Sequence, residues 1–124
     1  MKKLLPFLSA AILLTSCAVK KEIKEDQTLL NGNWELASAS FSKDLSKDFK
    51  EGLPTLTFDS TDNLAVFGYD GCNRINTKAT LKKDQGIVID QELRTTMMAC
   101  NKVKSNEYQN ALKAATTYDL RNNV

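Results

Sequence analysis

Residues 65–75 read Ala-Val-Phe-Gly-Tyr-Asp-Gly-Cys-Asn-Arg-Ile, a strand-like run that enters an Asp-Gly turn and leaves it again. Asp70-Gly71 suits a tight turn, because glycine adopts a positive φ without steric cost. Directly behind the turn lies Cys72, and its plausible partner is Cys100. The stretch therefore predicts a β-hairpin and a covalent link from its turn to a later segment.

Hairpins of this kind recur along the chain. Short runs alternate apolar with polar residues, and clusters rich in Asn, Asp, Gly, Ser and Lys separate them. We expect strands at residues 34–37, 55–59, 64–69, 73–81, 87–89 and 93–97. Strands that pair in sequence order form an antiparallel meander, which favours a mainly β (α+β) fold curled into a small barrel. Trp34 is in phase with Leu36, so we expect it in the core.

One segment after the strands has the spacing of a helix. Ser105 is a candidate N-cap, and Glu107 in the first turn complements the helix dipole. A single apolar face follows, made by Tyr108, Ala111, Leu112 and Ala115. We expect this helix to pack on the barrel or to close one of its ends.

A shorter helical spacing lies at residues 42–51. Phe41, Leu45 and Phe49 recur every four residues with Lys and Asp between them, and Gly52 ends the segment. We expect a short amphipathic helix that packs across the end of the barrel. The alternative is that these aromatic residues form a lid over a cavity.

The N-terminus has the plan of an exported leader. Two lysines precede an apolar run at residues 4–14, which at about 1.5 Å per residue is too short to span a hydrocarbon core of about 30 Å. Leu14-Thr15-Ser16-Cys17 resembles a bacterial lipobox, in which the cysteine is lipidated and becomes the first mature residue. We therefore expect a signal peptide at residues 1–16 and a membrane anchor on Cys17. The alternative is an ordinary cleavage site beside an incidental cysteine.

The segment after Cys17 is rich in Lys and Glu, and residues 17–28 are expected to form a solvated tether. Of the 17 basic residues, Lys2 and Lys3 belong to the leader, so the remainder is formally neutral against 15 acidic residues. This balance argues against nucleic acid as a partner. The residue after the lipid cysteine is Ala18 and not the Asp that would signal retention in the inner membrane. We therefore expect the protein in the bacterial cell envelope, at the outer membrane.

The absence of histidine excludes the commonest catalytic sites. The sequence has no histidine, and so no Ser-His-Asp triad, Cys-His pair or His zinc ligand. The acidic residues that could form a carboxylate pair fall at turn tips such as Asp62, Asp70 and Asp84, where we expect them to be solvated and not tuned for catalysis. We expect neither an enzyme nor a cofactor.

Cys72 and Cys100 are the thiols that remain once Cys17 is lipidated. An envelope location permits a disulfide, and closing a loop of this length is worth roughly 3.5 kcal/mol. Two alternatives use the same residues. With Met97 and Met98 the thiols could bind Cu(I), although paired methionines beside a strand more often pack. Redox catalysis would require a low-pKa thiol, and neither cysteine has that context.

Asn73 and Arg74 are the other polar residues of interest. They could form a recognition patch in which Arg74 binds a carboxylate or a phosphate. The favoured interpretation is structural: Asn73 bonds the turn backbone and Arg74 pairs with a neighbouring acid.

Five motifs in order resemble the META domain of HslJ-like bacterial lipoproteins. They are Asn33-Trp34-Glu35-Leu36, Pro54-Thr55-Leu56-Thr57-Phe58-Asp59, Gly71-Cys72-Asn73-Arg74, Thr96-Met97-Met98-Ala99-Cys100, and residues 107–112. The resemblance covers residues 29–124. It implies a compact β-barrel-like domain with one helix, exported by bacteria and linked with envelope stress and antibiotic tolerance. It implies no catalytic activity.

The end of the chain departs from this pattern. Members of the family continue past a Tyr-x-Leu strand into a further hairpin partner, whereas this sequence stops at Val124. The resemblance therefore implies either a C-terminal truncation or an unpaired strand edge. We expect residues 118–124 to be poorly held.

These observations favour a non-enzymatic, lipid-anchored envelope protein that acts by binding or by supporting tolerance of stress. The alternative is a carrier or pilot protein that holds an acyl chain or another apolar ligand in the barrel, with Phe41, Leu45 and Phe49 as its lid. A thiol or copper enzyme is a third hypothesis. The partner is an unknown envelope protein or a small apolar ligand, besides the membrane itself.

Overall fold

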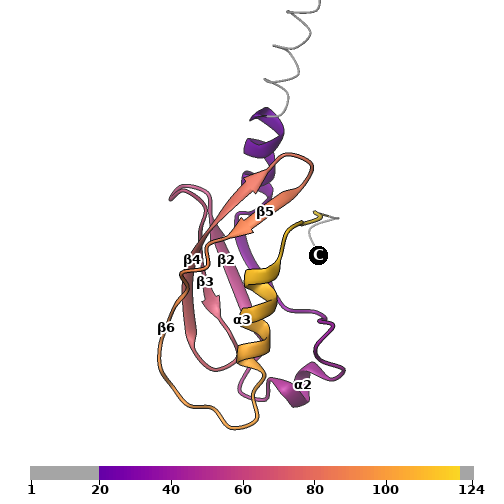
Figure 1. Ribbon diagram of the computed structural model, residues 1–124, viewed down its shortest axis with the longest axis vertical. Coiled ribbons are helices and arrows are strands. Elements are labelled where there is room, and N and C mark those ends of the chain that lie inside the picture. Colours follow the sequence, from indigo (N-terminus) through magenta and orange to yellow (C-terminus); the bar gives the residue numbers. More distant parts are fainter. Residues whose placement is uncertain (1–19, 121–124) are drawn as a thin grey trace, which may run out of the picture.

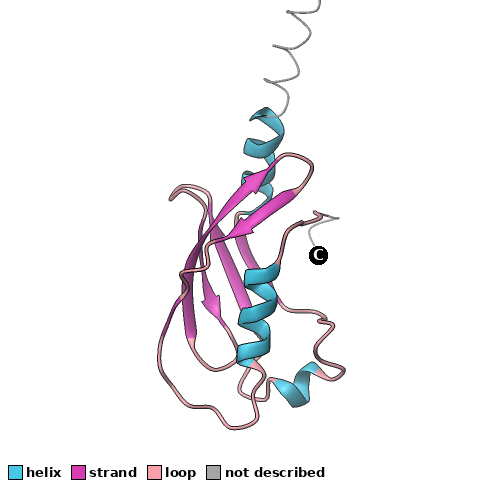
Figure 2. Ribbon diagram, viewed as in Figure 1, coloured by secondary structure: helices cyan, strands magenta, loops and turns pink. Residues whose placement is uncertain are grey.

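The computed structural model describes residues 20–120, and the expected signal peptide, the lipidated Cys17 and residues 121–124 lie outside this range. The fold is mainly β, as predicted, with an antiparallel sheet and a helix packed on it (Figures 1 and 2). In chain order the elements are β1 (Gly32–Glu35), α2 (Leu45–Asp48), β2 (Thr55–Asp59), β3 (Ala65–Tyr69), β4 (Arg74–Lys82), β5 (Gly86–Ile89), β6 (Arg94–Thr95) and α3 (Ser105–Ala114).

The sheet is open, which corrects the expectation of a barrel-like closure. Its strands pair in the order β1-β2-β3-β4-β5, and β6 pairs with β4. All of these pairs are antiparallel. No ladder joins β1 to β5 within the described residues, and α3 covers the apolar face in place of a closing strand (Figure 1). Alternating apolar residues determine which face is buried but not whether the sheet closes.

The core consists of two neighbouring clusters on the face covered by α3. The larger cluster contains the inward residues of the sheet: Leu30, Phe58, Leu64, Val66, Ala79, Leu81, Ile87 and Ile89. The smaller contains Phe49, Ile75 and Tyr108. Leu112 of α3 packs against both clusters, so the helix joins them. Trp34 and Leu36 pack inward at the edge of this core, as the sequence predicted.

Residues 20–30 form a helix where a solvated tether was expected. Ile23 packs against the core and Leu30 is buried, because positions 23, 26 and 30 lie on one face of a helix. The indole Nε1 of Trp34 donates a hydrogen bond to the carbonyl of Leu30 at 2.7 Å. On the same face, the hydroxyl of Tyr118 donates to the carboxylate of Asp26. The segment is therefore part of the folded domain.

The two predicted helices are present with changes at their ends. α2 is shorter than the expected segment at 42–51. The cap of α3 is Lys104 without a side-chain hydrogen bond, so Ser105 is the first helical residue and not the N-cap. Neither α3 nor any other helix within residues 20–120 has the length and apolar composition needed to cross a membrane.

After α3 the chain returns to the sheet. Thr117 forms a single bridge with Gly86, and the amide of Tyr118 donates to the carbonyl of Gln85 at 3.0 Å. Leu120 packs against the core. The expected weakness of residues 118–124 is therefore not seen at residues 118 and 120.

Candidate functional site

The hairpin turn between β3 and β4 is built around a buried carboxylate. Asp70 is 0% exposed, which corrects the expectation that it is solvated. Its Oδ1 accepts hydrogen bonds from the amides of Cys72 at 2.9 Å and Asn73 at 2.6 Å. Its Oδ2 accepts from Nε2 of Gln109 on α3 at 2.5 Å. Asp70 therefore closes the turn and attaches it to the helix.

The surroundings of Asp70 also affect a buried tyrosine. Tyr108 of α3 belongs to the smaller core cluster. Its burial, and then the negative charge of Asp70, raise the pKa of Tyr108 well above its ordinary value. The phenol of Tyr108 therefore stays protonated around neutral pH, which suits a structural role.

Gly71 is needed at the turn for two reasons. Its φ of 96° lies in the region that L side chains rarely adopt. A Cβ at this position would lie 2.5 Å from a ring carbon of Phe49 and 3.2 Å from a methyl carbon of Val103. The turn therefore sits tightly against the smaller core cluster.

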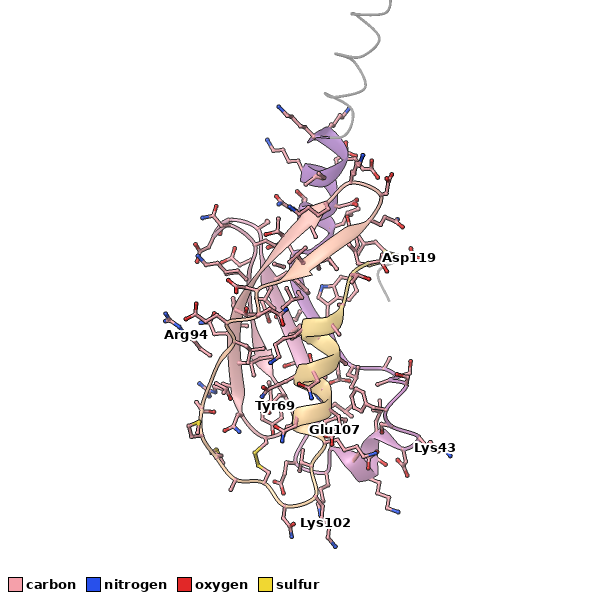
Figure 3. All side chains as sticks on the ribbon, viewed as in Figure 1. Lys43, Tyr69, Arg94, Lys102, Glu107 and Asp119 are labelled. Atoms are coloured by element: carbon pink, nitrogen blue, oxygen red, sulfur yellow. A yellow bond between two sulfur atoms is a disulfide. The ribbon has the colours of Figure 1, made fainter. Side chains whose placement is uncertain are left out.

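The predicted disulfide between Cys72 and Cys100 is present, with the two Cα atoms 5.8 Å apart (Figure 3). Cys72 is buried beside the turn. Because both sulfurs are used in this bond, neither cysteine can supply a thiolate to the Cu(I) site that the sequence left open. The disulfide fixes the segment after β6 to the β3–β4 turn.

The side chain of Asn73 holds the same segment by hydrogen bonds, while the Asn73 carbonyl bonds the turn backbone by accepting from the amide of Asp70 at 2.9 Å. Its Oδ1 accepts from the amide of Met98 at 2.6 Å and from the hydroxyl of Thr96 at 2.9 Å. Its Nδ2 donates to the carbonyl of Met98 at 3.1 Å. The Asn73 side chain thus donates to and accepts from the Met98 backbone, as the backbone of a neighbouring strand would. These bonds extend the contact between β4 and β6.

Met97 and Met98 do not pack, contrary to the favoured expectation. They are 91% and 66% exposed. Their backbone is held by Asn73 and by the disulfide, while both thioether side chains extend into solvent. The two methionines are therefore presented at the surface on a restrained segment.

Arg74 does not form the expected ion pair. Within residues 20–120 the salt bridge is the one between Lys104 and Asp48, at 3.4 Å. The backbone amide of Arg74 donates to the hydroxyl of Thr96 at 3.1 Å, and its guanidinium is exposed on the opposite face of the sheet from α3.

An apolar recess lies between β1, the segment at residues 38–41 and α3. Its volume is about 400 Å³. The larger residues that line it are Trp34, Leu36, Phe41, Leu56, Tyr108 and Leu112. Its size falls within the range of pockets that bind small molecules. The recess can exclude water from an apolar group but offers few polar partners.

The wall of the recess at residues 38–41 is tied to the helix. Nζ of Lys104 donates to the carbonyl of Phe41 at 3.0 Å and pairs with Asp48. The hydrogen bond from Ser42, and then Lys104, lower the pKa of the Asp48 carboxyl. The expected lid is only partly realised: Phe41 lines the recess, but Phe49 is buried and packs edge-to-face on the Phe41 ring.

Sequence analysis did not single out Gln109 or Asp26, whose side chains form hydrogen bonds between distant parts of the chain. Gln109 lies one position from Tyr108 on the predicted apolar face, so its proximity to the core could have been anticipated. Asp26 shares a helical face with Ile23 and Leu30, but the many Lys and Glu residues around it hide that spacing.

Comparison with known proteins finds one family match. The sequence profile of the META domain matches residues 27–124, which is more than half of the chain. No curated protein and no solved structure shows significant similarity to the chain.

Proposed function

Since this chain belongs to the META domain family, we propose that it is a non-enzymatic, lipid-anchored protein of the bacterial cell envelope that acts by binding. Three features support this. The lipobox-like tetrad ends at Cys17, shortly before the family domain. The one fully buried carboxylate described, that of Asp70, is occupied by the turn and by Gln109. The domain also contains an apolar recess.

The observation that carries the binding role is this recess. Its walls come from the sheet edge, a connecting segment and α3, and they bring together side chains that are far apart in the sequence. An apolar hollow left open to water is a cost that a binding partner removes. We propose that an apolar side chain of an envelope partner inserts there, and that this contact underlies a role in tolerance of envelope stress.

The lipid anchor gives this recess a place in the envelope. Residues 20–30 enter the domain at the end opposite α2 and the segment after β6 (Figure 1). An anchor at Cys17 therefore places the disulfide end farthest from the lipid, with the recess between the two ends. We propose the outer membrane as the location, because the residue after Cys17 is Ala18 and not an Asp-type retention signal.

The anchor is tested by growing cells with labelled palmitate. The wild-type chain is expected to incorporate label and to sediment with membranes, whereas Cys17→Ser is expected to do neither. A matched control is Ser16→Ala, which keeps a small residue before the cysteine. A wild-type chain that remains soluble with its leader intact contradicts the proposal.

The binding role is tested by filling the recess. Ala111 of α3 lines it, while Ala114 is exposed on the same helix and does not. In-cell crosslinking of the wild-type chain is expected to capture a discrete envelope protein. Ala111→Phe is expected to abolish that capture and Ala114→Phe to preserve it. Equal capture by all three chains contradicts binding through the recess.

A second candidate is a carrier of an acyl chain or another small apolar ligand, and the volume and apolar walls of the recess favour it. Native mass spectrometry of the chain purified from membranes distinguishes the two. A carrier shows an added ligand mass that Ala111→Phe removes and Ala114→Phe retains. Protein-partner binding shows crosslinked protein and no added ligand.

A further inference from the structure

The face of the sheet turned away from α3 carries a second groove, of about 850 Å³, that is separate from the recess. None of the described residues that line it is acidic. Its side-chain walls include Thr55, Phe67, Tyr69, Arg74, Asn76 and Arg94. We call it the arginine groove.

Strand register explains why these side chains lie together. Phe67 of β3 is paired with Asn76 of β4, and Asn76 is paired with Arg94 of β6. Tyr69 is paired with Arg74, two positions before Asn76 on the same face. Arg74 and Arg94 are thus diagonal neighbours across two strands, with Cα atoms roughly 7–8 Å apart. Two guanidinium groups and two aromatic rings therefore border one groove.

Both guanidinium groups are available to a ligand. Neither makes a hydrogen bond or an ion pair with another residue in the described range 20–120. Arg94 also borders a neighbouring groove with Asp90 and Glu92 on its walls, yet no carboxylate oxygen lies within 4.0 Å of it. The planar fork of arginine matches a carboxylate or a phosphate and can bind either through two parallel hydrogen bonds.

The remaining walls suit a hydroxylated ring more than a bare anion. Phe67 is 42% exposed, so a large part of its ring is open to solvent. Beside it, Asn76 and the hydroxyl of Thr55 provide neutral hydrogen-bonding groups. Aromatic rings pack well against the apolar C–H faces of sugars, while Asn and Thr bond sugar hydroxyls.

We propose that the arginine groove binds an acidic saccharide. Its carboxylate or phosphate lies between Arg74 and Arg94, and its ring lies on Phe67. This site does not depend on the proposed function of the recess, because the two lie on opposite faces of the sheet. It would let the anchored domain hold an envelope glycan on one side and its partner on the other.

The test measures saccharide binding to the full purified chain in detergent by titration calorimetry. Trigalacturonic acid is the carboxylate probe, glucose 6-phosphate the phosphate probe, and maltotriose the neutral probe. One of the two acidic probes is expected to bind at least about tenfold more tightly than maltotriose, and its affinity to fall with added salt. Which of them binds identifies the anionic group.

Matched variants locate the site. Arg74→Gln and Arg94→Gln are each expected to weaken binding by about tenfold. Lys43→Gln is the control, because it removes the same charge at the opposite edge of the molecule (Figure 3). It is expected to change binding less than about twofold. Arg74→Lys keeps the charge but loses the fork, and is expected to weaken binding by at least about threefold. Phe67→Ala is expected to weaken it by about fivefold, and Val88→Ala, which truncates another exposed strand residue, to leave it unchanged.

Several outcomes overturn the proposal. One is maltotriose binding as tightly as both acidic probes. Another is Lys43→Gln weakening binding as much as the arginine variants, because this reports net charge alone. Inorganic phosphate binding as tightly as the saccharides, with no effect of Phe67→Ala, makes the groove a simple anion site. Tight binding of a mononucleotide in preference to both acidic sugars also contradicts it.

Discussion

At the scale of single residues, the β3–β4 turn depends on one carboxylate that has no cationic partner among the described residues. Asp70 is stabilised by three N–H donors, two from its own turn and one from Gln109 of α3. A buried carboxylate requires such compensation, since an unpaired polar group in the core costs about 1–3 kcal/mol. The turn and the helix are therefore coupled through a single side chain.

Replacing Asp70 tests this coupling. Asp70→Ala leaves three donors without an acceptor, so we expect the free energy of unfolding to fall by about 3 kcal/mol. Asp70→Asn keeps one acceptor oxygen and is expected to cost about 1 kcal/mol. Urea denaturation provides the measurement, and Asp62→Ala, at an exposed turn, is the control with little expected effect. Equal losses at positions 62 and 70 contradict the role assigned to Asp70.

A pair of glycine variants separates backbone strain from crowding. Gly71 has a φ of 96° and no room for a Cβ beside Phe49, whereas Gly32 has a φ of 127° and nothing within 4 Å of an added Cβ. Gly32→Ala is expected to lower the free energy of unfolding by about 1 kcal/mol, through backbone strain alone. Gly71→Ala is expected to cost at least about 3 kcal/mol. If both variants lose a similar free energy of unfolding in urea denaturation, crowding against Phe49 adds no cost to the backbone strain at Gly71.

At the scale of elements, the sequence predicts strands well because their pattern is local. In β4, the alternation of Ile75, Thr77, Ala79 and Leu81 correctly identifies the buried face. The burial of Asp70 could not be predicted in this way, because its helix partner lies 39 residues away. The same holds for Asn73, which bonds a segment 25 residues later. Local rules identify a turn, but they do not say what packs on it.

The disulfide joins two elements that the sheet does not otherwise hold together firmly. β6 has only two residues, and the exposed segment that follows it depends on Cys100 and on Asn73 for attachment. Cys72→Ala/Cys100→Ala is expected to lower the free energy of unfolding by about 3.5 kcal/mol, because a loop with a sequence separation of 28 is no longer closed in the unfolded chain.

Reduction gives an independent measurement. Dithiothreitol is expected to shift the urea midpoint of the wild-type chain toward that of the double variant and to leave the double variant unchanged. Titration of unreduced protein is expected to find no free thiol at either position. Two reactive thiols before reduction would contradict the disulfide.

At the scale of the whole molecule, residues 20–30 form a helix that is docked on the domain. Ile23 and Leu30 attach this helix to the core, and the hydrogen bond from Tyr118 to Asp26 joins it to the segment after α3. A docked helix restricts the orientation of the domain at a membrane, whereas a solvated tether leaves it free.

Tyr118→Phe tests that docking by hydrogen exchange. The variant loses a hydrogen bond to a charged acceptor, worth about 1.5–3 kcal/mol, so the amides of residues 20–30 are expected to exchange at least about tenfold faster. Tyr69→Phe is the matched control, because its hydroxyl makes only a 3.5 Å contact with the carbonyl of Glu51. Unchanged protection at residues 20–30 in Tyr118→Phe means that apolar packing alone holds the helix.

The same variant has a signature at alkaline pH. Burial, and then the hydrogen bond to Asp26 and its negative charge, raise the pKa of Tyr118 above the value of about 10 that it has in an unfolded chain. Above that pH the unfolded chain releases this proton and the folded chain keeps it, so the contribution to stability is complete below about pH 10 and is lost as the pH rises further. Tyr118→Phe cannot ionise, and its free energy of unfolding is therefore expected to fall less between about pH 9 and pH 11 than that of the wild-type chain. The pKa of Tyr108 is raised in both proteins, so its contribution to the loss of stability at alkaline pH remains in the variant. Identical pH profiles of the two proteins would show that Tyr118 ionises as it does in water.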